Sequence, residues 1–364
     1  MIRKKLNPCT FFDDSTLSLE RKDLFNKPNY LGHRLMIPDH GAYFELKHPN
    51  KNKVMINDHG KIRVLSNVCR HRNAKMLNDK GTVNTIVCPV HRWTYDLGGH
   101  LIGAPKFEDL PKTCLPAEIP VDWNGLLFSH LTKSDSKKLD NFPFCSYFSF
   151  ANYSFHSIET HLCNYNWKTF IEVYLDDYHV KPFHPGLGNF VDCKKLEWFF
   201  SDFFSVQAVG ISGLKKKGTN IYNNWQDQIV NFHRNHSLEW GAIWMLIYPN
   251  IMLEWYPQTI VVSTVYPLDP QRTLNVTEFY YSEEIISFNK EYIQFQKEAY
   301  RETAQEDDDI GERMDKGKRS FEFDNKCNPN FLHPTLEKGI PEFYKYLKTN
   351  SSTNLREKYF EPIS

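Results

Sequence analysis

The stretch Val68 to Trp93 reads VCRHRNAKMLNDKGTVNTIVCPVHRW and contains two short clusters of cysteine and histidine. Cys69 and His71 form the first cluster, and Cys88 and His91 form the second after a gap of sixteen residues. Thiolate and imidazole are ligands of soft and borderline transition metals. The stretch therefore predicts a transition-metal site built from two loops.

The pairing within each cluster indicates which metal group binds. Zinc sites usually pair cysteine with cysteine and histidine with histidine. Here each cluster contributes one of each, so one iron can take both thiolates and a second iron both imidazoles, as in a Rieske [2Fe–2S] centre. Pro89 and the pair Gly98–Gly99 favour tight turns that direct backbone N–H groups at the cluster sulfurs. Zinc remains the alternative.

Outward from this stretch, short β-type runs extend from about Gly41 to His130, separated by Asn, Gly and Asp. Such runs predict a small antiparallel sandwich or barrel. A polar N-terminal region with a helix-like patch at Thr16–Leu24 precedes them, and the polar stretch Thr132–Asn141 is interpreted as a linker. We expect an N-terminal helical segment over residues 1–38, packed with a larger C-terminal domain. The expected domains are a cluster domain over 39–140 and the larger domain over 141–364.

A second constellation lies in the larger domain, where residues 166–184 read NWKTFIEVYLDDYHVKPFH. Glu172, Asp176 and His179 follow at steps of four and three, which places them on one face of a helix. His184 comes after Pro182, where we expect the helix to have ended. This pattern alone is also typical of a solvated helix face with one core histidine.

Two histidines and one carboxylate make the facial triad of a non-haem Fe(II) oxygenase, whose open positions take O₂. The acidic cluster at residues 306–309, late in a predicted long helix over 282–319, is the natural source of the carboxylate. A Rieske cluster by itself only transfers electrons. A metal site in the large second domain would be the acceptor of those electrons.

Together the two constellations resemble the α subunits of Rieske ring-hydroxylating oxygenases, over most of the chain and in the same order. Residues 88–95, CPVHRWTY, look like the family's C-P-x-H-G-W-x-Y, with Arg92 in place of the usual glycine. Residues 166–184 match its active-site signature, and residues 305–312 look like the segment that supplies the third iron ligand.

The resemblance implies a role for each matched residue. The implied ligands of the [2Fe–2S] cluster are Cys69, His71, Cys88 and His91. The implied ligands of a mononuclear Fe(II) are His179, His184 and Asp307, with Asp308 as the alternative to Asp307. Asp176 matches an aspartate that links a cluster histidine of one subunit, here His91, to an iron-ligand histidine of the next, here His179. This link implies a homotrimer.

The resemblance also implies a fold and an activity. The fold is α+β, with a small all-β Rieske domain and a helix-grip-like catalytic domain in which helices flank an antiparallel sheet. The activity is that of a terminal oxygenase, which hydroxylates, dihydroxylates or oxidatively demethylates a small organic substrate, including an aromatic one. Electrons come from a separate NAD(P)H-dependent reductase, with or without a ferredoxin. The matched residues do not separate these three reactions, and a plain α₃ trimer is preferred over α₃β₃.

Two other function classes stay open from the residues alone. One is a Rieske electron-transfer protein with no oxygenase activity, and the other is a zinc-stabilised binding module. Within the oxygenase reading, four aromatic residues could line the substrate pocket or fill the core of the sheet: Trp240, Trp244, Trp255 and Tyr256. An aspartate at position 176 disfavours a quaternary ammonium substrate, because relatives that act on choline or carnitine tend to carry glutamate there.

The composition narrows the choice of partners and compartment. The 364 residues have a formal net charge of zero and a pI of about 7.2, which gives no footprint for nucleic acid. We expect no signal sequence, because the N-terminus has no apolar segment, and no membrane span, because no long apolar run exists. The eight cysteines do not form a disulfide framework. The sequence therefore predicts a cytoplasmic protein.

Overall fold

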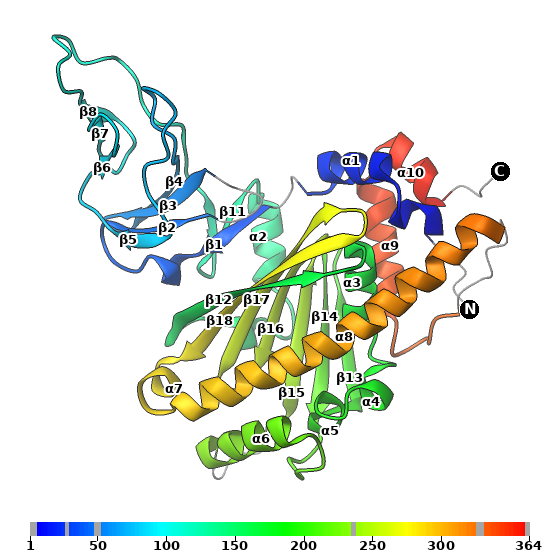
Figure 1. The fold of residues 1–364 in the computed structure, drawn as a ribbon. Coiled ribbons are helices and arrows are strands. Elements are labelled where there is room, and N and C mark those ends of the chain that lie inside the picture. The colour runs from blue at the N-terminus through cyan, green and yellow to red at the C-terminus, as the bar shows by residue number, and fades with distance from the viewer. Residues whose placement is uncertain (1–5, 26–28, 47–51, 234–237, 325–330, 361–364) are drawn as a thin grey trace. The chain divides into compact units, whose positions relative to one another are not determined.

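The computed structural model describes residues 6–25, 29–46, 52–233, 238–324 and 331–360. The chain forms two compact units, one of Lys27–Lys137 and one that joins Met1–Asn26 to Lys138–Ser364. The smaller unit is all-β and the larger one combines a sheet with helices (Figure 1). The expected α+β class is confirmed.

The smaller unit contains three small antiparallel sheets. A five-stranded sheet has the order β5-β2-β3-β4-β9, and two three-stranded sheets have the orders β6-β7-β8 and β1-β11-β10. The strands are β1 (Asn29–His33), β2 (Ala42–Glu45), β3 (Lys53–Asp58), β4 (Lys61–Ser66), β5 (Lys80–Thr82), β6 (Ile86–Val87), β7 (Thr94–Tyr95), β8 (Leu101–Gly103), β9 (Ala117–Glu118), β10 (Val121–Trp123) and β11 (Leu126–Ser129). The short helix η2 (Arg34–Met36) follows β1.

The larger unit is built on one seven-stranded antiparallel sheet of order β12-β18-β17-β16-β15-β14-β13. Its strands are β12 (Tyr153–Cys163), β13 (Val191–Phe200), β14 (Phe204–Ile211), β15 (Trp240–Ile247), β16 (Ile251–Tyr256), β17 (Thr259–Asp269) and β18 (Arg272–Ser282). The apolar run of β15, WGAIWMLI, is buried throughout, because side chains cover both faces of the sheet there.

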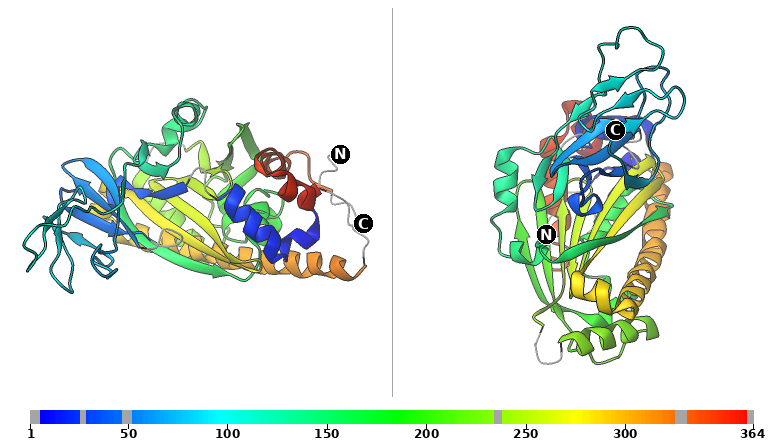
Figure 2. Two further views of the ribbon diagram at one scale, coloured as in Figure 1. Left: turned by 90° about the horizontal axis from the view of Figure 1, so that it is seen from above. Right: turned by 90° about the vertical axis from the view of Figure 1, so that its left-hand side faces the viewer.

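Helices surround this sheet, and the long helix α8 crosses over its strands (Figures 1 and 2). The helices are η1 (Pro8–Phe11), α1 (Asp14–Asp23), α2 (Lys133–Leu139), η3 (Cys145–Phe148), α3 (Trp167–Tyr174), α4 (Val180–Phe183), α5 (Leu187–Phe190), α6 (Asn220–His233), α7 (Glu283–Phe288), α8 (Lys290–Asp324), α9 (Gly339–Asn350) and α10 (Thr353–Phe360). Among the described residues, none of the helices has both the length and the apolar character that crossing a bilayer requires.

The strand register decides which side chains share a face. Trp244 of β15 pairs with Glu254 of β16, which pairs with Val261 of β17, so these three point to the same side. Trp244 and Val261 belong to the core cluster that includes residues of α6 and α8. Glu278 of β18 pairs with the next residue of β17, Val262, and therefore points to the opposite side.

Buried lysine–carboxylate pairs tie the helices of the larger unit together. Lys168 of α3 contacts Glu20 of α1 at 2.6 Å, with side chains 0% and 1% exposed. Lys318 of α8 contacts Glu172 of α3 at 2.8 Å, also with little exposure. A buried charge without such a partner is strongly unfavourable, so loss of either lysine would destabilise the packing of the helices that these pairs connect.

The stretch interpreted as a linker spans the boundary between the two units, which falls between Lys137 and Lys138, and it contains α2. The Thr132 hydroxyl accepts a hydrogen bond from the Asp135 N–H at 3.1 Å and caps the start of this helix. Two other local expectations are wrong. The long helix is interrupted at Asn289, between α7 and α8. The helix that begins at Trp167 ends at Tyr174, before Asp176.

Candidate metal centres

The two loops that carry the Cys/His clusters are built alike. In each, the cysteine N–H donates to the carbonyl five residues later, and the cysteine carbonyl accepts from the N–H four residues later. The residue four after the cysteine has a left-handed backbone, Asn73 with φ 58° and Arg92 with φ 60°. Glycine adopts this conformation without strain, which explains why it suits the position that Arg92 occupies.

The loops separate the thiols from the imidazoles. Cys69 and Cys88 are 1% and 2% exposed and belong to the core of the smaller unit, whereas His71 is half-buried and His91 is exposed. The two imidazole rings lie 4.6 Å apart between centroids. This order fits a cluster with an inner iron on the thiolates and an outer iron on the imidazoles.

Side chains around the loops fit a bound cluster as well. The buried Nδ1 atom of His71 has no hydrogen-bond partner among the described residues, as expected of an atom that waits for a metal. The Tyr95 hydroxyl lies 3.5 Å from Cys69 Sγ. Burial raises the pKa of Tyr95, so the hydroxyl stays protonated and can donate to sulfur. The indole of Trp93 stacks on the His71 ring at 4.8 Å.

In the larger unit, His179, His184 and Asp307 converge on one point. His179 immediately precedes α4, His184 follows it, and Asp307 lies in the middle of α8. His179 Nε2 and His184 Nε2 are 3.0 Å apart, and Asp307 Oδ1 is 3.4 Å from the first and 3.1 Å from the second. The three ligand atoms form a compact triangle.

This triangle has the dimensions of one face of a coordination octahedron. Two ligand atoms about 2.1 Å from one ion and at right angles to each other lie about 3.0 Å apart. Asp307 Oδ1 is buried and accepts no hydrogen bond from any described residue. Two imidazoles and one carboxylate on one side of an ion are the donor set of a facial triad with open positions opposite.

Each histidine of the triangle has a second carboxylate behind it. Glu306 Oε2 lies 2.6 Å from His184 Nδ1, and Asp176 Oδ2 lies 3.1 Å from His179 Nδ1. Burial lowers the pKa of His179, but the carboxylates of Asp176 and Asp307 outweigh it and raise that pKa to about 10. Carboxylates in this position orient metal-binding imidazoles and strengthen them as ligands.

Asp308, the neighbour of Asp307, points elsewhere. Its carboxylate contacts His161 Nε2 of β12 at 2.6 Å and accepts a hydrogen bond from the Tyr165 hydroxyl at 3.1 Å. Successive residues of a helix point about 100° apart, so α8 can present only one of the two aspartates to the histidines.

The expected common face for Glu172, Asp176 and His179 is wrong. The Asp176 carboxylate accepts hydrogen bonds from the N–H groups of Tyr178 and His179 at 2.7 and 3.3 Å and thereby shapes a turn between α3 and α4. Glu172 instead binds Lys318 and the hydroxyl of Tyr344. Pro182 lies within α4 rather than after the end of a helix.

A cavity adjoins the triangle, and its walls are rich in aromatic residues, among them Tyr174, Tyr222, Trp225, Trp244, Tyr256 and Tyr300. Two of the four aromatic candidates, Trp244 and Tyr256, therefore line it. Trp240 contacts Phe144 instead, and Trp255 contacts Tyr147.

The cavity also contains Glu254, which the sequence analysis missed. Glu254 is 4% exposed and accepts hydrogen bonds from the hydroxyls of Tyr256 at 2.8 Å and Tyr300 at 3.1 Å. Burial raises the pKa of Glu254 to about 7. The feature of the sequence that could have indicated Glu254 is a single acid inside the otherwise apolar strand IMLEWY.

A second missed residue, Asp177, lines the same cavity. It is 2% exposed, and neither carboxylate oxygen has a hydrogen-bond partner among the described residues. Burial, with a smaller contribution from Asp176, raises the pKa of Asp177 to about 8. A buried polar group without a partner is unusual and calls for a ligand or water.

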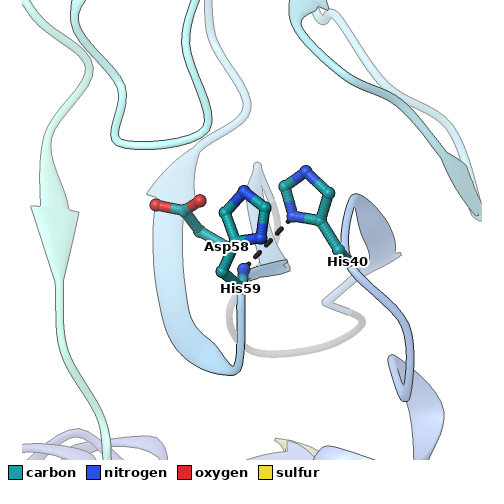
Figure 3. A group of neighbouring side chains, drawn as sticks. All are labelled: His40, Asp58 and His59. Carbon is teal, nitrogen blue, oxygen red and sulfur yellow. Dashed lines mark hydrogen bonds between the residues drawn. The ribbon is translucent and has the colours of Figure 1, made fainter.

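A third histidine–carboxylate group, His40, Asp58 and His59, lies in the smaller unit (Figure 3). The two imidazole rings are stacked, with centroids 3.6 Å apart and planes at 14°. Nearly parallel rings aim their in-plane lone pairs in parallel directions, and His40 Nδ1 already accepts the His59 N–H at 3.2 Å. The group is an exposed packing contact rather than a preformed metal site.

Comparison with known proteins agrees with both centres. Residues 30–114 match the model of the Rieske [2Fe–2S] domain, and residues 145–352 match that of the catalytic domain of the ring-hydroxylating alpha subunit. The chain belongs to the family of the α subunits of Rieske ring-hydroxylating oxygenases. The oxygenase is 44% identical over 347 residues to putrescine 2-hydroxylase of Ralstonia nicotianae, which covers 94% of each chain.

One further relative and one solved structure show the same family and the same fold. Putrescine 2-hydroxylase of Bordetella bronchiseptica is 39% identical over 365 residues, covering 95% of this oxygenase and 84% of the relative. The fold is shared with a quaternary ammonium Rieske monooxygenase solved in complex with L-carnitine, with a TM-score of 0.75 at 19% identity, over 96% of each chain.

These matches confirm the main functional expectations. The oxygenase uses a Rieske [2Fe–2S] cluster and a mononuclear iron, and it is the terminal oxygenase of its system. The alternative of an electron-transfer protein without oxygenase activity is not supported, because residues 145–352 match the catalytic domain and the relatives are named as hydroxylases. Inter-subunit electron transfer is described for a quaternary ammonium Rieske monooxygenase whose fold this chain shares, with a TM-score of 0.75 at 19% identity.

Proposed function

We propose that the oxygenase hydroxylates a short aliphatic diamine of the putrescine type at carbon 2. The observation that carries this proposal is Glu254, a buried carboxylate in the cavity beside the histidine–aspartate triangle. Within the described residues, no lysine or arginine forms an ion pair with it. The two relatives named for putrescine hydroxylation supply the substrate class.

The chemistry of the cavity suits an alkylammonium ion. Aliphatic amines have pKa values near 10, so a diamine carries two positive charges at neutral pH. An ammonium that enters a cavity with little water needs a carboxylate to offset its lost hydration. Trp244 and Tyr256 beside Glu254 add ring faces that attract cations and cover the methylene chain. An aromatic acid, by contrast, would place its carboxylate against Glu254.

We propose that His179, His184 and Asp307 hold the mononuclear iron and that Cys69, His71, Cys88 and His91 hold the cluster. The bound iron supplies O₂ activation beside the substrate. The chain's own residues then have distinct tasks. Glu306 and Asp176 orient the two imidazoles through their Nδ1 atoms. The aromatic walls exclude water, and Glu254 fixes the position of the amine.

We further propose a homotrimer that receives electrons from a separate NAD(P)H-dependent reductase, with Asp176 as the link between subunits. The exposed imidazole of His91 supports this assembly, as do apolar side chains that are exposed near the two metal centres. Val90 and Phe107 of the smaller unit are 57% and 48% exposed, and Tyr178 of the larger unit is 59% exposed. Contact between these surfaces would bury them and bring Asp176 to His91 of the next subunit.

Replacing Glu254 by glutamine is expected to lower kcat/KM for putrescine by roughly 30-fold or more, because one partner of a buried charge pair is lost.

In the native enzyme, kcat/KM should rise with pH through about 7, as Glu254 becomes ionised while the amines stay charged. The groups that face Glu254 are the hydroxyls of Tyr256 and Tyr300, with Tyr174 and Asp307 within electrostatic range. Glu254→Gln should lack the part of this rise that lies near pH 7. The measurement is formation of 2-hydroxyputrescine with a reconstituted reductase.

Glu278→Gln is a matched control. Glu278 is also buried and also accepts a hydrogen bond from the tyrosine two residues later, Tyr280, at 2.7 Å. It points to the opposite side of the sheet, so its substitution is expected to leave kcat/KM near the native value. Equal losses in both variants would assign the effect to the fold and count against the role of Glu254.

A further inference from the structure

The larger unit contains buried carboxylates with and without a lysine partner. Away from the cavity, Glu20 pairs with the buried Lys168, and Glu172 pairs with Lys318, whose side chain is 15% exposed. In the cavity, neither Glu254 nor Asp177 pairs with a lysine or arginine among the described residues, and neither carboxylate oxygen of Asp177 has a hydrogen-bond partner among them. Two acids without cations in one cavity leave room for two positive charges from a ligand.

We propose that Asp177 and Glu254 bind the two ammonium groups of a diamine, with Asp177 holding the one nearer the iron. This inference rests on the proposed function and deepens it, because it states that the enzyme recognises both ends of its substrate. It predicts selectivity for diamines over monoamines of equal length.

The placement of the two acids fits a substrate that lies along the cavity. Asp177 lies in the turn between α3 and α4, two residues before His179, whereas Glu254 lies on β16 of the sheet. Tyr174 lies within electrostatic range of both: burial, and then the charge of Glu254 with a smaller contribution from Asp177, raises its pKa. Tyr174 also lines the cavity, so its ring can cover the methylene groups between the two ends.

The position of Asp177 bears on which carbon reacts. The backbone turn that carries Asp177 also carries His179, so an ammonium bound to Asp177 is fixed relative to the triangle of His179, His184 and Asp307. Carbon 2 is separated from that nitrogen by one methylene group. Fixing the ammonium nitrogen at Asp177 therefore selects a carbon close to that nitrogen for reaction. The ion pair between the other ammonium and Glu254 fixes the orientation of the diamine.

Selectivity follows from leaving a buried acid without a partner. A monoamine such as 1-aminobutane can satisfy only one of the two carboxylates, and the other stays buried without a cation. Sites that bind a polar group reject an analogue without it by up to 10⁴-fold or more, for this reason. Here one expects putrescine to be favoured over 1-aminobutane by roughly 10²-fold or more in kcat/KM.

The test is the ratio of kcat/KM for putrescine to kcat/KM for 1-aminobutane in the native enzyme, Asp177→Asn, Glu254→Gln and the control Glu278→Gln. The ratio cancels losses of iron, of electron transfer or of folded protein, because these affect both substrates equally. Asp177→Asn and Glu254→Gln should each lower the ratio at least 10-fold, and the control should not. Anaerobic equilibrium dialysis with both amines gives the same comparison for binding without turnover.

The possible outcomes distinguish a failure of the two-ended site from a failure of the proposed function. A native enzyme that favours putrescine, together with an Asp177→Asn variant that keeps the full ratio, overturns the role of Asp177 and leaves the proposed function standing. A native enzyme that hydroxylates both amines equally overturns the two-ended site without need of any variant, even where Asp177→Asn yields no folded protein. A native enzyme that binds and oxidises neither amine overturns the proposed function and this inference with it.

Discussion

Asp307→Ala is expected to lose the mononuclear iron and nearly all hydroxylation of substrate while keeping the Rieske cluster. Asp307 Oδ1 lies 3.4 and 3.1 Å from the two histidine Nε2 atoms and is the only acid among the described residues that completes this group. Loss of residues that merely orient ligands costs 10- to 100-fold in affinity or activity, so loss of a ligand should cost more. Metal analysis and product formation measure the two effects.

Asp308→Ala is the matched variant, one residue further along α8. Its carboxylate contacts His161 and Tyr165 rather than the two histidines of the triangle. We expect it to keep the mononuclear iron and to lose less activity than Asp307→Ala. Iron loss in Asp308→Ala with iron retained in Asp307→Ala would contradict the assignment and make Asp308 the third ligand.

Asp176→Asn is expected to lower turnover by roughly 10²-fold with both metal centres retained. Asparagine keeps an oxygen that can accept the hydrogen bonds from the Tyr178 and His179 N–H groups, so the turn between α3 and α4 should persist. It loses the negative charge that faces His179 Nδ1 at 3.1 Å. The proposed path from the cluster of one subunit to the iron of the next is thereby interrupted.

Rapid-mixing kinetics locate the defect of Asp176→Asn. The reductase should reduce the cluster at the native rate, because the cluster lies in the smaller unit and is unchanged. Reoxidation of the reduced cluster in the presence of substrate and O₂ should be slow. Native reoxidation in this variant would remove Asp176 from the electron path, and loss of iron would make it a structural support of His179 only.

The two Cys/His loops could be predicted from the sequence because their geometry is local. Each loop places its cysteine and histidine within a few residues of each other, and the loops of Cys69 and Cys88 share one hydrogen-bond pattern. The left-handed backbone at Arg92 was not apparent from the residue itself, since arginine gives no sign of that conformation.

The triangle of His179, His184 and Asp307 could be predicted only in part, because it joins elements that are distant in the chain. His179 and His184 followed from their spacing, but the choice between Asp307 and Asp308 depends on the rotation of α8 about its axis, which no local pattern fixes. The end of α3 was also missed, because Asp176 caps a turn with its side chain instead of continuing the helix. Asp177 and Glu254 acquire meaning only when the fold brings them to one cavity.

Iron and acid-labile sulfide content, with the EPR spectrum of the reduced protein, tests the two metal centres most directly. The samples are anaerobically purified native enzyme and His179→Ala. We expect about three irons and two sulfides per native chain, and about two irons in the variant with the reduced-cluster signal unchanged. Two irons in both proteins would contradict the site of His179, His184 and Asp307, and zinc without sulfide would contradict the cluster as well.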